Sequence, residues 1–86
     1  MSAEITMYST RYCPYCMGAR SLFEGRKLPY KDIGVDGNPE LRRRMTALSG
    51  RHTVPQIWVG DQHIGGFDEL RALDRDGQLD KLLNAA

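Results

Sequence analysis

Cys13-Pro14-Tyr15-Cys16 follows directly on the short run Ile5-Thr6-Met7-Tyr8, and this stretch decides which fold the chain adopts. The β-branched and aromatic residues of the first run predict a strand. Pro14 predicts the start of a helix, because a residue at the first helical position has no intrahelical partner for its N–H. The stretch therefore predicts a strand that leads into a helix with two thiols at its tip.

The two cysteines are expected to differ in reactivity. As the N-cap of a helix over residues 14 to about 26, Cys13 meets unpaired backbone N–H groups and the positive end of the helix dipole, and both stabilise an anion. Cys16 falls on the same apolar stripe as Phe23 and is predicted to face inward. Because the thiolate is the reactive form, we expect Cys13 to attack a disulfide and Cys16 to resolve the product.

Length and charge exclude several classes of function. The 86 residues suit one domain, residues 1–86, with one site, and the formal net charge of +1 shows none of the excess of Lys and Arg that nucleic-acid binding needs. The first residues lack the features of a signal peptide, and no apolar stretch is long enough to span a bilayer. We therefore expect a cytoplasmic protein without a nucleic-acid or membrane partner.

A Cys-x-x-Cys pair at a strand–helix junction of a cytoplasmic protein is typical of a redox dithiol or of a metal site. Two cysteines cannot complete a four-ligand zinc site, and His52 and His63 lack the usual spacing of zinc ligands. A site shared between two chains stays open as an alternative. We predict a redox dithiol that requires no metal.

The rest of the chain alternates between strand and helix patterns. The predicted elements are a strand within residues 28–35, a helix from Asn38-Pro39 to Gly50, strands at Gln56-Ile57-Trp58-Val59 and Gln62-His63-Ile64, and a final helical segment broken near Gly77. Leu41, Met45 and Leu48 form the apolar stripe of the second helix. The order β-α-β-α-β-β-α predicts an α/β fold with a four-stranded mixed sheet flanked by helices.

Three motifs, in this order and at these separations, resemble the small bacterial dithiol glutaredoxins: Cys13-Pro14-Tyr15-Cys16, Thr53-Val54-Pro55-Gln56 and Ile64-Gly65-Gly66-Phe67-Asp68-Glu69-Leu70. The likeness covers nearly the whole chain, and Pro-Tyr between the cysteines is similar to glutaredoxins, whereas thioredoxins carry Gly-Pro there. The resemblance implies a thioredoxin fold. It also implies a glutathione-dependent oxidoreductase that reduces glutathione mixed disulfides and protein disulfides through a Cys13–glutathione intermediate.

By the same resemblance, Val54-Pro55 is a cis peptide beside the cysteines, and the Val54 backbone pairs with glutathione like an added strand. Gly65-Gly66 and the Asp68 region receive the γ-glutamyl end, since glycines admit a ligand to the backbone and a helix start offers N–H groups to a carboxylate. Glutathione acts as a cosubstrate, and its predicted contacts are Arg11, Tyr15, Arg42, Thr53, Val54, Pro55, Gly66, Phe67, Asp68 and Glu69.

The sequence departs from the family pattern at Thr10, where many glutaredoxins have a lysine, and we expect Arg11 to supply the missing positive charge. In the run Arg42-Arg43-Arg44 a solvated helix face is the simpler interpretation, with Arg42 the candidate for a glutathione carboxylate. His52 and His63 are expected to be bystanders.

The resemblance implies glutathionylated or disulfide-containing proteins as partners, with ribonucleotide reductase as one candidate, and a monomeric state. Two alternative functions stay open. One is a redoxin that a flavoprotein reductase reduces directly. The other is a homodimeric module in which two Cys13 thiolates and two glutathiones hold an iron–sulfur cluster, an arrangement that the stiffness of Pro14 is expected to disfavour.

Overall fold

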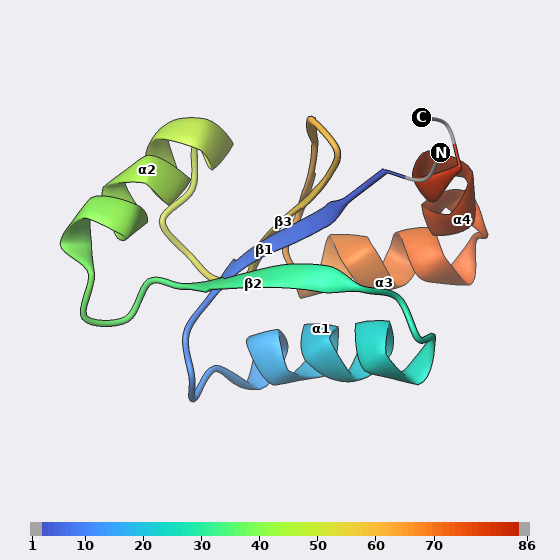
Figure 1. Cartoon of the computed structure of the whole chain (residues 1–86), viewed down its shortest axis with the longest axis horizontal. Coiled ribbons are helices and arrows are strands. Elements are labelled where there is room, and N and C mark those ends of the chain that lie inside the picture. Colours follow the sequence, from blue (N-terminus) through green and yellow to red (C-terminus); the bar gives the residue numbers. More distant parts are fainter. Residues whose placement is uncertain (1–2, 85–86) are drawn as a thin grey trace.

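A four-stranded mixed sheet with helices packed around it forms the centre of the computed structural model, which describes residues 3–84 (Figure 1). The elements along the chain are β1 (Ile5–Ser9), α1 (Pro14–Gly25), β2 (Tyr30–Gly34), α2 (Pro39–Ser49), β3 (Gln56–Val59), β4 (Gln62–Gly65), α3 (Phe67–Arg75) and α4 (Gln78–Leu83). The predicted element order is confirmed, and the final helical segment divides into α3 and α4 next to Gly77. Among the described residues, no helix has the length and apolar character to cross a membrane.

The sheet has the strand order β2-β1-β3-β4. β1 and β2 are parallel, as a strand–helix–strand connection requires, whereas β3 is antiparallel to both β1 and β4. This arrangement confirms the predicted four-stranded mixed sheet. It also brings the C-terminal end of β1 next to the start of β3, so the chain segments that follow β1 and precede β3 lie close together.

Alternation along β1 separates two hydrophobic clusters, one on each face of the sheet. Ile5 and Met7 belong to the larger cluster, which also contains the buried side chains of α1, α3 and α4. Tyr8 belongs to the smaller cluster, with Val35 and the α2 residue Met45. The sheet is therefore covered by three helices on one face and by α2 on the other.

The predicted apolar stripe of α2 is only partly buried. Met45 is fully buried and Leu41 is partly buried, but Leu48 is 54% exposed, so the predicted stripe does not reach the core along its whole length. Figure 1 shows α2 set toward one end of the sheet, and of its apolar stripe only Leu41 and Met45 pack into the cluster on that face.

The helix boundaries follow the predicted signals. Cys13 is the N-cap of α1 with Pro14 in its first turn, and the side chain of Asn38 caps α2 by accepting a hydrogen bond from the Leu41 N–H at 3.1 Å. Gly50 ends α2 in the left-handed conformation, with φ 75°, which glycine adopts without a steric penalty. These boundaries place both cysteines at the start of α1.

Replacing Met45 with Ala is expected to lower the free energy of unfolding by about 2–5 kcal/mol, because the change opens a cavity at the main anchor of α2. The matched substitution Leu48→Ala removes an exposed side chain of the same helix and is expected to change stability by no more than about 0.5 kcal/mol. Chemical denaturation of both variants measures the difference. Equal losses would contradict the described packing of α2.

Candidate active site

Cys13 places its sulfur where the backbone of α1 begins. The backbone of Cys13 is extended, with φ −86° and ψ 118°, and its Sγ accepts a hydrogen bond from the Cys16 N–H at 3.3 Å. The sulfur also lies 3.6 Å from the carbonyl oxygen of Val54, to which the thiol donates. Cys13 is partly exposed, so its sulfur contacts both the helix start and the loop before β3 while it remains accessible to a substrate.

Cys16 is shielded from solvent, as the sequence predicted. Its side chain is 0% exposed, and both cysteines are free thiols. Burial raises the pKa of Cys16 to about 12, and its hydrogen bond with Cys13 adds to the effect. Cys16 is therefore protonated near neutral pH, and the two thiols have the unequal environments that a pair of attacking and resolving thiols needs.

The loop before β3 brings its backbone to Cys13. The Val54–Pro55 peptide bond is cis, which confirms the expectation from the family resemblance. The side chain of Gln56 is buried and fixes this loop by hydrogen bonds. Its Nε2 donates to the carbonyl oxygen of Thr53 at 3.0 Å and to Thr53 Oγ1 at 3.3 Å. The Oε1 of Gln56 lies 2.8 Å from Nε2 of His63 on β4. His63 thus contacts the side chain that fixes the loop, and it does not line the pocket.

The start of α3 contributes the third segment of the site. The Gly66 N–H donates to Oε1 of Glu69 at 2.7 Å, and Arg51 donates to the same oxygen at 3.0 Å. These interactions lower the pKa of the Glu69 carboxyl, the Gly66 hydrogen bond having the larger effect. Gly65 has φ 117°, and a Cβ there would lie 2.5 Å from this oxygen, so the close approach of Glu69 requires glycine.

Phe67 fixes the distance between α3 and α1. A Cβ added at Gly18 of α1 would lie 3.0 Å from Cζ of Phe67, so this glycine allows the ring to pack directly against the helix backbone. The start of α3 therefore lies next to the first turns of α1.

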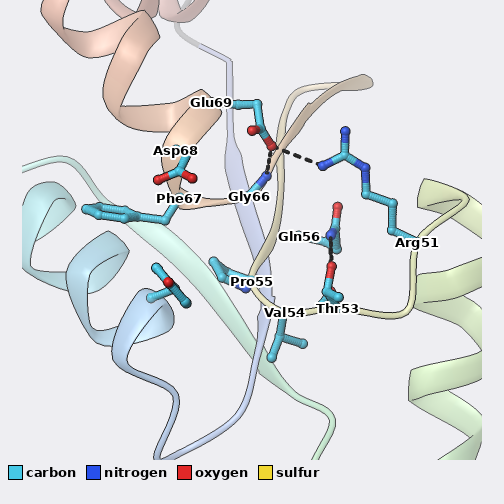
Figure 2. Close-up of a pocket in the computed structure, with 10 residues that line it drawn as sticks. Arg51, Thr53, Val54, Pro55, Gln56, Gly66, Phe67, Asp68 and Glu69 are labelled. Carbon is cyan, nitrogen blue, oxygen red and sulfur yellow. Dashed lines mark hydrogen bonds and ion pairs between the residues drawn. The ribbon is translucent and has the colours of Figure 1, made fainter.

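A pocket of about 210 Å³ lies where the loop before β3, the start of α3 and the side chain of Tyr15 meet (Figure 2). It is lined by Tyr15, Arg51, Thr53, Val54, Pro55, Gln56, Gly66, Phe67, Asp68 and Glu69. Eight of the predicted glutathione contacts are brought together in this lining. Cys13 stands beside it, since its sulfur contacts the lining residue Val54.

Two predicted contacts lie outside the pocket lining. Arg11 forms an ion pair with Asp36 (Nε to Oδ2, 3.2 Å), and its side chain is 78% exposed. Arg42 donates from Nη1 to the carbonyl oxygen of His52 at 2.8 Å. In this structure both guanidinium groups therefore bind other parts of the protein, and neither residue lines the pocket.

Two residues that line the pocket, Arg51 and Gln56, are not among the contacts predicted from the sequence. Gln56 stands in the quoted motif Thr53-Val54-Pro55-Gln56, and a polar residue at the start of a buried strand was the available signal. Arg51 gave no such signal, because its partner Glu69 lies 18 residues further along the chain. Within residues 3–84, no three His, Cys, Asp or Glu side chains gather as a metal site would need.

Comparison with known proteins identifies the class of this site. The family model described as Glutaredoxin matches residues 5–64. The chain is 46% identical over 81 residues to a glutaredoxin of Pseudomonas aeruginosa, covering 94% of this chain and 96% of the relative. It is 44% identical over 81 residues to glutaredoxin 3 of Escherichia coli K12, covering 94% and 98% of the two chains.

Solved structures agree with these relatives. A buckwheat glutaredoxin–glutathione complex superposes with a TM-score of 0.86 at 29% identity, covering 96% of this chain and 78% of the other. The glutaredoxin of Brucella melitensis gives 0.83 at 40% identity, covering 95% and 89%. The chain has the thioredoxin fold and belongs to the glutaredoxin family of glutathione-dependent disulfide oxidoreductases.

Iodoacetamide is expected to label Cys13 and to spare Cys16 at neutral pH. Burial and the raised pKa of Cys16 keep its thiolate fraction very low, so the Cys13→Ser variant is expected to react at least about a hundredfold more slowly than the Cys16→Ser variant. Mass spectrometry of the folded proteins over time measures both rates. Comparable labelling of the two variants would contradict the described burial of Cys16.

The Glu69 carboxylate is expected to make stability depend on pH on the acid side. Because its folded pKa lies below its ordinary value of 4.5, its stabilisation is present above that pH and is lost as the pH falls through the folded value. Glu69→Gln should therefore lose less stability on acidification than the wild type. Denaturant unfolding at neutral and acidic pH tests this, with exposed Glu4→Gln as the control that should follow the wild type.

Proposed function

We propose that the protein removes glutathione from mixed disulfides through its first thiol. The Cys13 thiolate attacks the glutathionyl sulfur, the substrate sulfur leaves as a thiolate that takes up a proton, and glutathione stays bound in a Cys13–glutathione disulfide. A second glutathione then attacks this disulfide and leaves as glutathione disulfide, which restores the Cys13 thiolate. The accessible position of the Cys13 sulfur at the helix start, beside the pocket, is the observation that carries the proposal.

Protein disulfides follow a second branch that needs both thiols. Cys13 attacks the protein disulfide, and Cys16 then attacks Cys13, which frees the second substrate thiol and closes the Cys13–Cys16 disulfide. Glutathione reopens that bond. The hydrogen bond from the Cys16 N–H to the Cys13 sulfur supports this branch, because it places the two cysteines side by side at the start of α1.

The proposed glutathione site is the pocket beside Cys13. The Val54 backbone is the edge along which an extended peptide pairs, and the N–H groups at the start of α3 receive the γ-glutamyl carboxylate. Asp68, exposed at the pocket, is the candidate for the ammonium group, because the Glu69 carboxylate already accepts hydrogen bonds from Gly66 and Arg51 (Figure 2). The buckwheat structure, solved with glutathione, supports the choice of ligand.

Arg11 and Arg42 stay predicted contacts for the remaining carboxylate of glutathione. The Arg11–Asp36 pair is solvent-exposed, and such pairs contribute only about 0–1 kcal/mol, so a ligand carboxylate competes for Arg11 at little cost. Disulfide-containing proteins, including ribonucleotide reductase, are the proposed substrates. A monomeric state and a cytoplasmic location stay predictions as well.

Turnover of a small glutathione mixed disulfide, coupled to NADPH through glutathione reductase, tests the proposal. We expect activity in the wild type and in Cys16→Ser, because the first branch uses one thiol. Cys13→Ser should lose at least about a thousandfold, since it removes the nucleophile.

Circular dichroism of the three proteins is the control for folding. Turnover retained in a folded Cys13→Ser variant would overturn the assignment of the nucleophile. The proposal would also fail if the folded wild type showed no turnover of the mixed disulfide but was reduced by a flavoprotein reductase without glutathione. That result would indicate a directly reduced redoxin.

A further inference from the structure

Arg20 lies one helical turn beyond Cys16 on α1 and joins that helix to two strands. Its Nε donates to Asp32 Oδ2 on β2 at 2.8 Å, and its Nη2 donates to Ser9 Oγ on β1 at 2.8 Å. The same Nη2 donates to the carbonyl oxygen of Thr10 at 3.1 Å. The Ser9 hydroxyl donates in turn to the second carboxylate oxygen of Asp32, which closes a ring of polar contacts.

This network is partly shielded from water. Ser9 is 1% exposed, and the side chains of Arg20 and Asp32 are 23% and 31% exposed. Electrostatic effects are stronger there than on an open surface, because solvent screens them less. These residues lie outside the glutathione pocket, so their contacts need an explanation other than ligand binding.

Cys16 is the thiol that must ionise to resolve the intermediate, and it lies on the same helix as Arg20. Residues four apart on a helix are neighbours, so Arg20 stands beside Cys16. Burial, the hydrogen bond with Cys13 and the charge of Cys13 raise the pKa of Cys16, whereas a hydrogen bond from the Thr10 backbone and the charge of Arg20 lower it. Arg20 thus supplies one of these two favourable influences directly, and its guanidinium also holds the Thr10 segment through the Thr10 carbonyl.

Two other titratable groups face Arg20 from β2. Asp32 carries a negative charge that offsets the cation, and burial raises the pKa of Tyr30 to about 12, so Tyr30 is neutral near neutral pH. In the Cys13–glutathione intermediate the Cys13 sulfur is in a disulfide and has no charge. Of the protein groups that shift the pKa of Cys16, Arg20 then supplies the remaining charge, and its partner Asp32 offsets that charge.

We propose that Arg20 is a positioning residue for the second thiol, holding the Thr10 segment and stabilising the Cys16 thiolate as it attacks the Cys13–glutathione disulfide. In that step the Cys16 thiol loses its proton to solvent and the Cys13–Cys16 bond forms. The bond from Cys13 to glutathione breaks, and glutathione leaves as a thiolate that takes up a proton. The inference rests on the dithiol branch of the proposed function, in which Cys16 attacks a mixed disulfide on Cys13. The Cys13–glutathione disulfide represents that intermediate, with glutathione in place of the substrate thiol.

Release of glutathione from protein prepared as the Cys13–glutathione disulfide measures this step directly. Samples quenched with acid and analysed by mass spectrometry give the release rate at each pH. Arg20→Gln is expected to slow release at neutral pH by about three- to tenfold, since a higher thiol pKa lowers the thiolate fraction more than it raises nucleophilicity. Its pH profile should move to higher pH.

The Asp32→Asn variant changes the local charge in the opposite direction to Arg20→Gln. It therefore distinguishes an effect of the Arg20 charge from a structural role of the network. It removes the carboxylate that offsets Arg20, so the profile should move to lower pH. A merely structural role would impair both variants alike. Arg44→Gln, an exposed arginine on α2, is the matched control and should follow the wild type.

The possible outcomes distinguish the inference from the function on which it rests. Opposite shifts in the two variants support the role of Arg20, and absent or parallel shifts overturn it while leaving the enzyme assignment intact. If the wild type releases no glutathione at any pH, the dithiol branch itself fails. Should Arg20→Gln not fold, Asp32→Asn decides alone: a shift to lower pH supports the inference, and any other result overturns it.

Discussion

The position of the Cys13 sulfur is the constraint on which the rest of the site depends. It must cap α1, remain open to a substrate and lie next to a backbone edge along which a peptide can pair. The contacts to the Cys16 N–H and to the Val54 carbonyl meet these requirements together. They are possible because β1 and β3 are neighbours in the sheet, so that the loops at their adjoining ends meet.

Around this sulfur, the protein uses its charged groups mostly to hold its own segments. Glu69 links the start of α3 to Arg51, and Arg20 links α1 to β1 and β2. The pocket is therefore formed largely by backbone and by side chains whose hydrogen bonds are already made. Such preorganisation suits a small peptide ligand, because less conformational freedom is lost when it binds.

Much of the fold could be predicted because its signals are local. The strand patterns, the prolines at two helix starts and Gly50 at a helix end act through the conformation of neighbouring residues, and the structure has each of them. The exception on α2 is instructive. Leu48 continues the apolar stripe of Met45, yet it is exposed, because burial depends on which other elements pack against that part of the helix.

The sequence by itself determined the chemistry of the site: a dithiol at a helix start, a proline before the third strand and paired glycines before the next helix. Tertiary structure alone decided the partners of the charged residues. Arg11 pairs with Asp36, 25 residues away, and Arg51 reaches Glu69 across the pocket. A helix cap depends on residues within one turn, whereas an ion pair depends on which distant segments meet, and that is fixed only when the sheet has formed.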